Sequence, residues 1–120
     1  MSTPTYTFHR GEPLAFGDRV ESGTVLAGHT MRARMKWVPL GDRMPGDEVP
    51  LVSPALVTTF VPAAGAEPAY WLHSLSEAQT WALAAGGYLA DTALLLGGVV
   101  IMITDPVRIM LLNSATGSAP

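Results

Sequence analysis

The sequence predicts an all-β protein, an antiparallel β-sandwich of about seven strands with one short helix. Short runs of apolar and β-branched residues recur along the chain, and turns that contain glycine or proline separate them. Residues 29–37 alternate strictly between apolar and polar side chains, which is typical of a strand with one face in water. Residues 76–84 carry a pattern that starts a helix, whereas a helix-rich fold is not expected. The 120 residues are expected to form a single domain.

The first half of the chain is expected to contribute four strands. Residues 6–16 should form two short strands divided by a break at Gly11–Pro13, because glycine and proline interrupt regular pairing. The third strand covers residues 29–37, and residues 56–61 form the fourth. In the third strand, one face holds His29, Met31, Ala33, Met35 and Trp37, and the other holds Thr30, Arg32, Arg34 and Lys36.

A proline-rich segment, residues 39–54, separates the third strand from the fourth and holds four prolines and two glycines. We expect a long exposed loop there, because proline cannot donate a hydrogen bond within a sheet. The segment exceeds the usual connection of roughly 4–6 residues, which makes it a candidate contact loop. Its candidate partner-binding residues are Arg43, Met44 and Asp47.

The second half is expected to contain a turn at residues 62–68 and a strand at residues 70–75. The sequence Ser74-Leu75-Ser76-Glu77 matches the capping-box pattern and predicts a helix over about residues 76–84, capped by one of the two serines. Gly86-Gly87 should end this helix. Further strands are expected at residues 88–96, 99–104 and 107–112, with a flexible tail at residues 113–120.

Residues 82–103 form an apolar stretch long enough to span a membrane as a helix. Asp91 lies in its middle, and two Gly-Gly pairs, at residues 86–87 and 97–98, divide it into pieces of strand length. We therefore expect buried strands and no membrane span. The first residues contain no apolar segment of the kind that a signal peptide requires, so none is expected.

The composition excludes several functional classes. The chain has no cysteine, which rules out disulfides, thiolate metal sites and cysteine nucleophiles. Its net charge of −3 and isoelectric point near 5.4 argue against nucleic-acid binding. Hydrophobic residues make up 48% and charged residues only 14%, against a usual share of about 25% charged. The sequence thus indicates a compact and unusually apolar domain.

No residue pattern points to catalysis. The three histidines, His9, His29 and His73, lack the spacing of metal ligands, although the fold could bring two of them together. The acidic residues Asp42, Asp47 and Glu48 could bind calcium, but the spacing of an EF-hand is absent. No nucleophile motif or phosphate-binding glycine pattern is present. We expect no enzyme activity, no cofactor and no metal.

The last strands are apolar on both faces. In residues 107–112, Val107, Ile109 and Leu111 form one face, and Arg108, Met110 and Leu112 form the other. Because a free sandwich keeps one face of each sheet in water, the second apolar face should be covered by a partner in an assembly. The candidate partner-binding residues are Val100, Met102, Arg108, Met110 and Leu112. The alternative is that the helix and the 39–54 loop cover this face.

Five short motifs occur in a fixed order along the chain. They are Arg10-Gly11-Glu12, residues 31–36 (MRARMK), residues 75–80 (LSEAQT), Gly87-Tyr88 followed by Asp91, and Thr104-Asp105-Pro106 before residues 107–109. Together they resemble a small immunoglobulin-like β-domain of tail, neck and baseplate structural proteins of tailed bacteriophages, including the N-terminal domain of baseplate upper proteins. The chain departs from that pattern in its longer 39–54 loop and in having no fibre region after the domain, which favours a stand-alone adaptor or decoration subunit.

The resemblance implies a virion structural protein, an adaptor or attachment subunit at the tail, neck or tail-fibre junction that acts by protein–protein binding. Its expected partners are other phage structural proteins and further copies of itself, and its expected location is the virion. Tyr88, at a sandwich corner, should be buried with its hydroxyl bonded to nearby backbone. The alternatives are a capsid decoration protein and a carbohydrate-binding sandwich in which Tyr70 and Trp71 stack on sugars.

Overall fold

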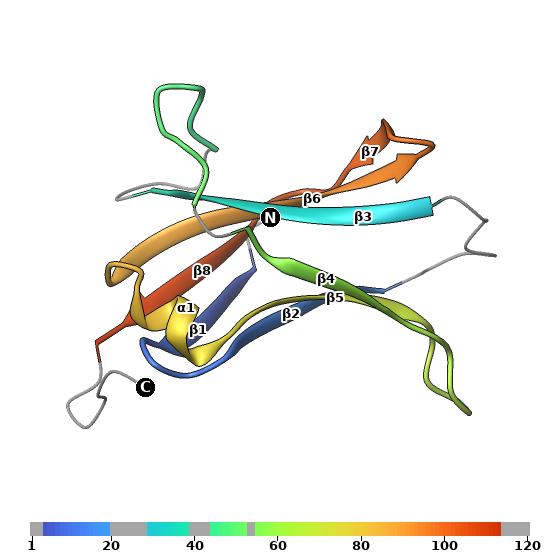
Figure 1. Ribbon diagram of the computed structural model, residues 1–120, viewed down its shortest axis with the longest axis horizontal. Helices are drawn as coiled ribbons and strands as arrows, with labels where there is room; N and C mark the ends of the chain where they lie inside the picture. The colour runs from blue at the N-terminus through green and yellow to red at the C-terminus, as the bar shows by residue number, and fades with distance from the viewer. Residues whose placement is uncertain (1–3, 20–28, 39–43, 53–54, 114–120) are drawn as a thin grey trace.

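The computed structural model describes residues 4–19, 29–38, 44–52 and 55–113, and these form two facing β-sheets with one short helix (Figure 1). The large sheet contains β1 (Thr5–His9), β3 (His29–Trp37), β6 (Gly86–Leu96), β7 (Val99–Ile103) and β8 (Val107–Leu112). The small sheet contains β2 (Leu14–Arg19), β4 (Val57–Val61) and β5 (Tyr70–Leu75), and the helix is α1 (Glu77–Trp81). The predicted all-β sandwich with one short helix is therefore confirmed.

The strand order is β1-β8-β6-β3 in the large sheet, with β7 also paired to β6, and β2-β5-β4 in the small sheet. Neighbouring strands are antiparallel except β1 and β8, which pair in parallel with Tyr6 opposite Ile109. The expectation of purely antiparallel pairing is thus wrong for this one pair. Alternation along a strand shows which face is buried, but it carries no information about the direction of the neighbouring strand.

The core lies between the inner faces of the two sheets. In β3 the predicted alternation is confirmed, because Ala33 and Met35 are buried and Arg32 and Arg34 are exposed. The buried cluster consists of Leu14, Phe16, Ala33, Met35, Leu56, Leu75, Tyr88, Ala90, Ile109 and Leu111. These side chains come from both sheets, so burying them holds the two layers together.

The helix α1 is shorter than expected, and its capping box lies two residues later than Ser74–Glu77. The side chain of Ser76 accepts a hydrogen bond from the Gln79 backbone amide at 3.2 Å, and the Gln79 side chain accepts one from the Ser76 amide at 2.8 Å. Ser74 instead belongs to β5. After the helix, the buried Tyr88 hydroxyl donates to the Ala84 carbonyl at 2.6 Å, which confirms the predicted tyrosine corner.

Two of the sequence motifs meet at this helix. The Thr80 side chain is fully buried, and its hydroxyl accepts from the Gly11 amide at 3.1 Å and donates to the Glu12 carbonyl at 2.8 Å. The Arg10 guanidinium donates to the Trp81 carbonyl at 2.8 Å and lies 4.8 Å from the centre of the Trp81 ring. The Arg-Gly-Glu motif and the helix motif therefore have a structural role, since they fasten α1 to the turn between β1 and β2.

Candidate interaction surface

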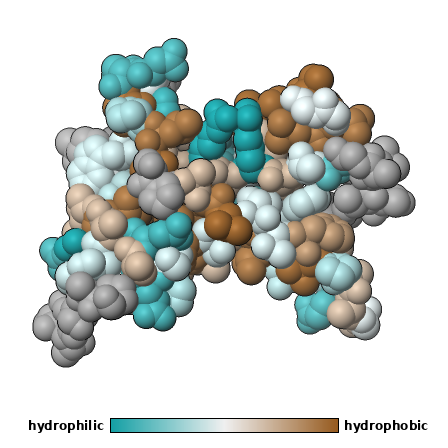
Figure 2. All heavy atoms as spheres, in the orientation of Figure 1, coloured by the Kyte–Doolittle hydropathy of each residue, from teal (hydrophilic) through white to brown (hydrophobic). Residues whose placement is uncertain are grey.

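The hairpin of β6 and β7 exposes a continuous run of apolar side chains. Residues 94–103, which we call the apolar arm, contain no polar side chain, and every residue of β7 is between 38% and 65% exposed. Gly97 and Gly98 form its turn with φ angles of 59° and 82°, as a two-residue type I′ hairpin turn requires. Figure 2 shows apolar surface gathered on this hairpin, at the opposite end of the large sheet from α1.

The outer edge of β7 has few features that discourage contact with other chains. Edge strands are usually protected by charged residues or proline, and β7 has neither. Its ladder with β6 shifts register between Leu94 and Leu95, which leaves Ile101 as an extra residue. Such a bulge twists an edge and interrupts regular pairing. The arm is therefore better suited to inserting side chains into a partner than to extending a sheet continuously.

The predicted partner-binding residues are divided between the arm and β8, which pairs with Gly86–Ala90 of β6, away from the arm. Val100 and Met102 are exposed in the arm. In β8, Ile109 and Leu111 are buried, whereas Leu112 is exposed and Arg108 and Met110 are half-buried. The division of β8 into two faces follows the sequence pattern. The alternative that α1 and the loop cover the second face does not hold for the arm, because its side chains remain accessible.

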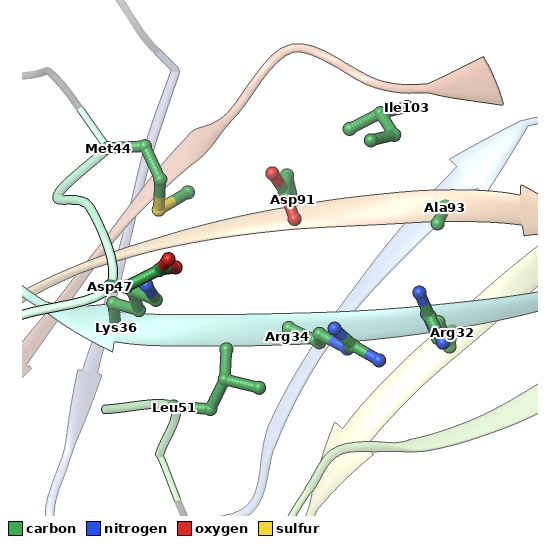
Figure 3. Close-up of a pocket in the computed structure, with 9 residues that line it drawn as sticks. All are labelled: Arg32, Arg34, Lys36, Met44, Asp47, Leu51, Asp91, Ala93 and Ile103. Atoms are coloured by element: carbon green, nitrogen blue, oxygen red, sulfur yellow. The ribbon is translucent and has the colours of Figure 1, made fainter. Parts of the chain in front are cut away.

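A groove of about 320 Å³ lies on the outer face of the large sheet, beside the arm. Its floor comes from β3 and β6, Ile103 of β7 stands at one side, and the segment 44–52, which rises from this face in Figure 1, stands at the other. Figure 3 shows the lining residues: Arg32, Arg34, Lys36, Met44, Asp47, Leu51, Asp91, Ala93 and Ile103. The expected contact residues Met44 and Asp47 thus belong to the groove, whereas Arg43 lies outside the described residues.

The groove contains three cationic side chains and two carboxylates, beside apolar residues. Arg34 faces Asp91 across the β3–β6 pair, with Arg32 two residues earlier in β3. Among the residues that the structure describes, neither Arg32 nor Arg34 makes a hydrogen bond or a close ion pair, whereas Lys36 Nζ donates to the Gly46 carbonyl at 2.7 Å. Burial raises the pKa of Asp91, and the neighbouring charges of Arg34 and Lys36 act in the opposite direction.

Sequence reasoning identified the polar face of residues 29–37 but not the groove. The available signal was the spacing of Arg32, Arg34 and Lys36, which places three cations on one strand face. The other walls come from Asp91 and from segment 44–52, which are distant in sequence, so only the pairing of β3 with β6 brings them together.

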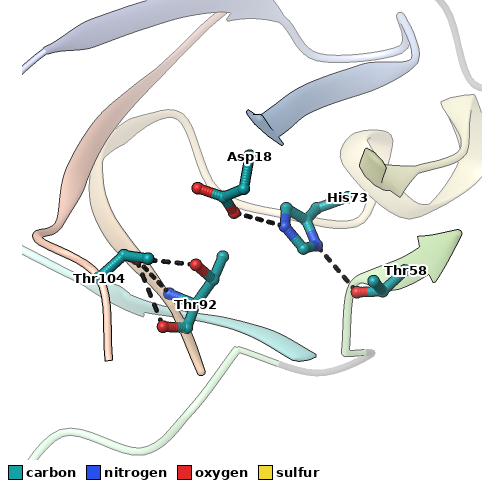
Figure 4. A network of polar contacts seen from close by, with 5 residues as sticks. All are labelled: Asp18, Thr58, His73, Thr92 and Thr104. Atoms are coloured by element: carbon teal, nitrogen blue, oxygen red, sulfur yellow. Dashed lines mark hydrogen bonds and ion pairs between the residues drawn. The ribbon is translucent and has the colours of Figure 1, made fainter. Parts of the chain in front are cut away.

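The small sheet contains a partly buried polar network of three side chains (Figure 4). His73 is fully buried, its Nδ1 lies 2.8 Å from the Thr58 hydroxyl, and its Nε2 lies 2.7 Å from Asp18 Oδ2. A neutral imidazole with its proton on Nε2 satisfies both contacts, because it donates to Asp18 and accepts from Thr58. The order of hydroxyl, imidazole and carboxylate is that of a catalytic triad, but His73 has no exposed surface with which to meet a substrate. The network joins β2, β5 and β4.

The remaining candidate residues are separated by the fold. His9 contacts Glu12 through Nδ1 at 3.4 Å on the surface, and His73 lies in the small sheet, whereas His29 begins β3 in the large sheet. Among the described residues, no three acidic or histidine side chains gather as a metal site would require. Of the carbohydrate candidates, Trp71 packs against Phe60 with the ring centres 4.9 Å apart. Tyr70 is the adjacent residue of β5, so its side chain points to the other face of the sheet. These two rings therefore cannot form one platform.

The structure also bears on the apolar stretch at residues 82–103. Within the described part of the chain, no helix has the length and apolar character needed to cross a bilayer. The stretch instead supplies β6 and β7. The expectation that its strands are buried is wrong for β7, whose residues are all exposed because it pairs only with β6. In comparisons with known proteins, neither a protein-family model nor a curated protein sequence matches this chain.

Proposed function

We propose that this chain is a structural subunit of a tailed-bacteriophage virion, an adaptor or attachment protein at the tail, neck or tail-fibre junction that acts by protein–protein binding and not by catalysis. The phage assignment is supported by the ordered sequence motifs described above. The observation that carries the binding role is the apolar arm, whose side chains are exposed on both faces of a hairpin.

Exposure of the arm has an energetic cost that binding would remove. Removing apolar surface from water is favourable by roughly 25 cal/mol for each Å² that is buried. Contiguous exposed apolar patches larger than several hundred Å² usually mark interaction sites in soluble proteins. Leu112 of β8 is also exposed on this sheet, at the opposite end of β6 from the arm, where it offers a separate apolar contact. A subunit that is repeated by the symmetry of a particle can use such contacts many times.

Light scattering of the purified chain tests the binding role. We expect an oligomer, or reversible association, because a 12.7 kDa monomer leaves the arm in water. Val99→Lys should shift the mass toward the monomer, since Val99 is 65% exposed in the arm. Val57→Lys is the matched control, because Val57 is 55% exposed on β4 of the small sheet. A wild-type monomer that remains monomeric with other particle proteins would contradict the proposal.

The outer face of β8 and the virion location need separate experiments. Replacing Met110 and Leu112 with lysine should leave the chain folded but block its incorporation into particles; unfolding would show that this face is core. Immunoblotting of purified particles should find the chain in a constant ratio to the tail proteins and in the tail fraction after particles are dissociated. Recovery with capsids would identify a decoration protein, and absence from particles would contradict a virion role.

A further inference from the structure

Two arginines on the floor of the groove make no close ion pair with a described residue, although Asp91 lies opposite Arg34 in the β3–β6 pair. Arg32 and Arg34 are exposed on β3, and neither guanidinium has a hydrogen bond or a close ion pair with a described residue. A guanidinium presents a planar fork of donors that matches a carboxylate, and the pair can form two parallel hydrogen bonds. The floor of the groove is therefore equipped to bind carboxylates.

The spacing of the two arginines matches an extended polypeptide. Residues i and i+2 of a strand lie on the same face, separated by roughly 6.5–7 Å. Acidic side chains at alternate positions of an extended segment have the same repeat, so one segment can place a carboxylate on each guanidinium. The volume of about 320 Å³ is at the lower end of ligand pockets and accommodates a few side chains.

The walls favour a polypeptide over a nucleic acid. Met44, Leu51 and Ile103 give the groove apolar sides that can contact the residues between the acidic ones. Asp47 and Asp91 also line it and would repel a continuous polyanion. The chain as a whole carries a net charge of −3, which opposes the long-range attraction on which nucleic-acid binding depends.

We infer that this groove is a binding site for an extended acidic segment of a partner protein, held by Arg32 and Arg34 through alternate carboxylates. Asp91 sets the strength of this contact, because its negative charge lies beside the same cations. The inference goes beyond the proposed function. The groove would select a partner by the positions of its acidic residues, whereas the apolar arm supplies apolar contact.

The test is a titration of the full chain into a fluorescein-labelled peptide that has glutamate at every second position, followed by fluorescence anisotropy. A peptide with glutamine in place of each glutamate is the control. We expect saturable binding of the glutamate peptide that weakens as salt is added, and about tenfold weaker binding of the glutamine peptide. Equal binding of the two peptides would overturn the inference.

Substitutions then locate the site. Arg32→Gln and Arg34→Gln should each weaken binding about fivefold, and the double variant should fall to the level of the glutamine peptide. Both side chains are exposed and unpartnered, so the fold should be retained, which circular dichroism can verify. Thr59→Glu, on exposed β4, changes the net charge by the same amount and should leave affinity unchanged. Loss of binding in Thr59→Glu equal to that in Arg34→Gln would overturn the site.

A gain of affinity provides a second test in the opposite direction. Asp91→Asn should strengthen peptide binding, because it removes a negative charge from the groove. Glu67→Gln removes the same charge from an exposed turn and should have little effect. Displacement of the peptide by equimolar inorganic phosphate, or tighter binding of a single-stranded oligonucleotide, would overturn a peptide site. These variants lie outside β7, so the titration can fail while the oligomer test of the apolar arm succeeds, and the reverse.

Discussion

The hydroxyl groups of Thr92 and Thr104 lie 2.7 Å apart at the point where the apolar arm leaves the large sheet. The Thr104 amide also donates to the Thr92 carbonyl at 2.9 Å, and the Thr92 amide donates to the Thr104 hydroxyl at 3.1 Å. Thr92 is buried on β6, and Thr104 directly follows β7. These contacts close the base of the arm, so they hold a largely exposed hairpin in a fixed position.

Thr104→Val should lower the free energy of unfolding by about 1–2 kcal/mol, because it leaves the buried Thr92 hydroxyl and amide without this partner. Thr92→Val should cost less, since the Thr104 hydroxyl still has the Thr92 amide as a partner. The double variant should cost about as much as Thr104→Val alone. Urea denaturation measures these values, and Thr59→Val on exposed β4 is the control. Simple additivity of the two substitutions would show that the hydroxyls are not coupled.

The second prediction concerns Gly86, which has a φ angle of 143° and lies against the ring of Trp37. A Cβ atom at Gly86 would lie 2.3 Å from Trp37 Cη2, and Trp37 in turn packs edge-on against Tyr88. Gly86→Ala should therefore destabilise the fold by about 2–3 kcal/mol through overpacking and backbone strain.

Gly65→Ala separates the two causes. Gly65 also has a positive φ angle, of 58°, but open space surrounds the position of its Cβ. Gly65→Ala should therefore lower the free energy of unfolding by only about 1 kcal/mol, from backbone strain alone. Thermal unfolding followed by circular dichroism gives both values. Equal losses for the two variants would contradict the role of the Trp37 contact.

Much of the fold was predictable because local patterns report local geometry. The alternation in residues 29–37 identified both faces of β3, and the Gly97-Gly98 pair divided residues 94–103 into a hairpin. The buried Tyr88 followed from its place after a helical turn. In each case the residues that carry the signal are also the residues that form the structure.

The parts that sequence reasoning missed depend on contacts between distant segments. The parallel pairing of β1 with β8 joins the first strand to the last, and the groove requires β3, β6 and segment 44–52 together. The polar network was missed for the same reason, because Asp18 and His73 are 55 residues apart. The capping box was placed two residues early because Ser74 and Ser76 both fit the pattern, and only the pairing of Ser74 within β5 distinguishes them.

The third prediction tests the acceptor that Asp18 provides to the buried His73. Asp18→Ala leaves His73 Nε2 without its partner and should cost about 2 kcal/mol in the free energy of unfolding. Asp18→Asn keeps an oxygen acceptor in place and should cost less than about 1 kcal/mol. Chemical denaturation at neutral pH compares the two. Equal losses would mean that packing of the side chain, and not its hydrogen bond, stabilises the small sheet.

The fourth prediction follows from Asp91, whose pKa is raised by burial above its usual range, against the opposing charges of Arg34 and Lys36. Because the folded state then binds a proton more tightly than the unfolded state, stability falls as the pH rises from the unfolded pKa through the folded one. Asp91→Asn removes this cost. The variant should match the wild type in acid, below both pKa values, and should exceed its unfolding free energy at neutral pH.

Urea denaturation of both proteins at a series of pH values tests this expectation. Glu67→Gln, which removes a negative charge from an exposed turn, shows how much of any change comes from net charge alone. The gain of Asp91→Asn over that control should grow as the pH rises through the window and then become constant. A gain that is the same at every pH would show that the amide packs better than the carboxyl. A loss at neutral pH would show that attraction to Arg34 and Lys36 outweighs the cost of burying the charge.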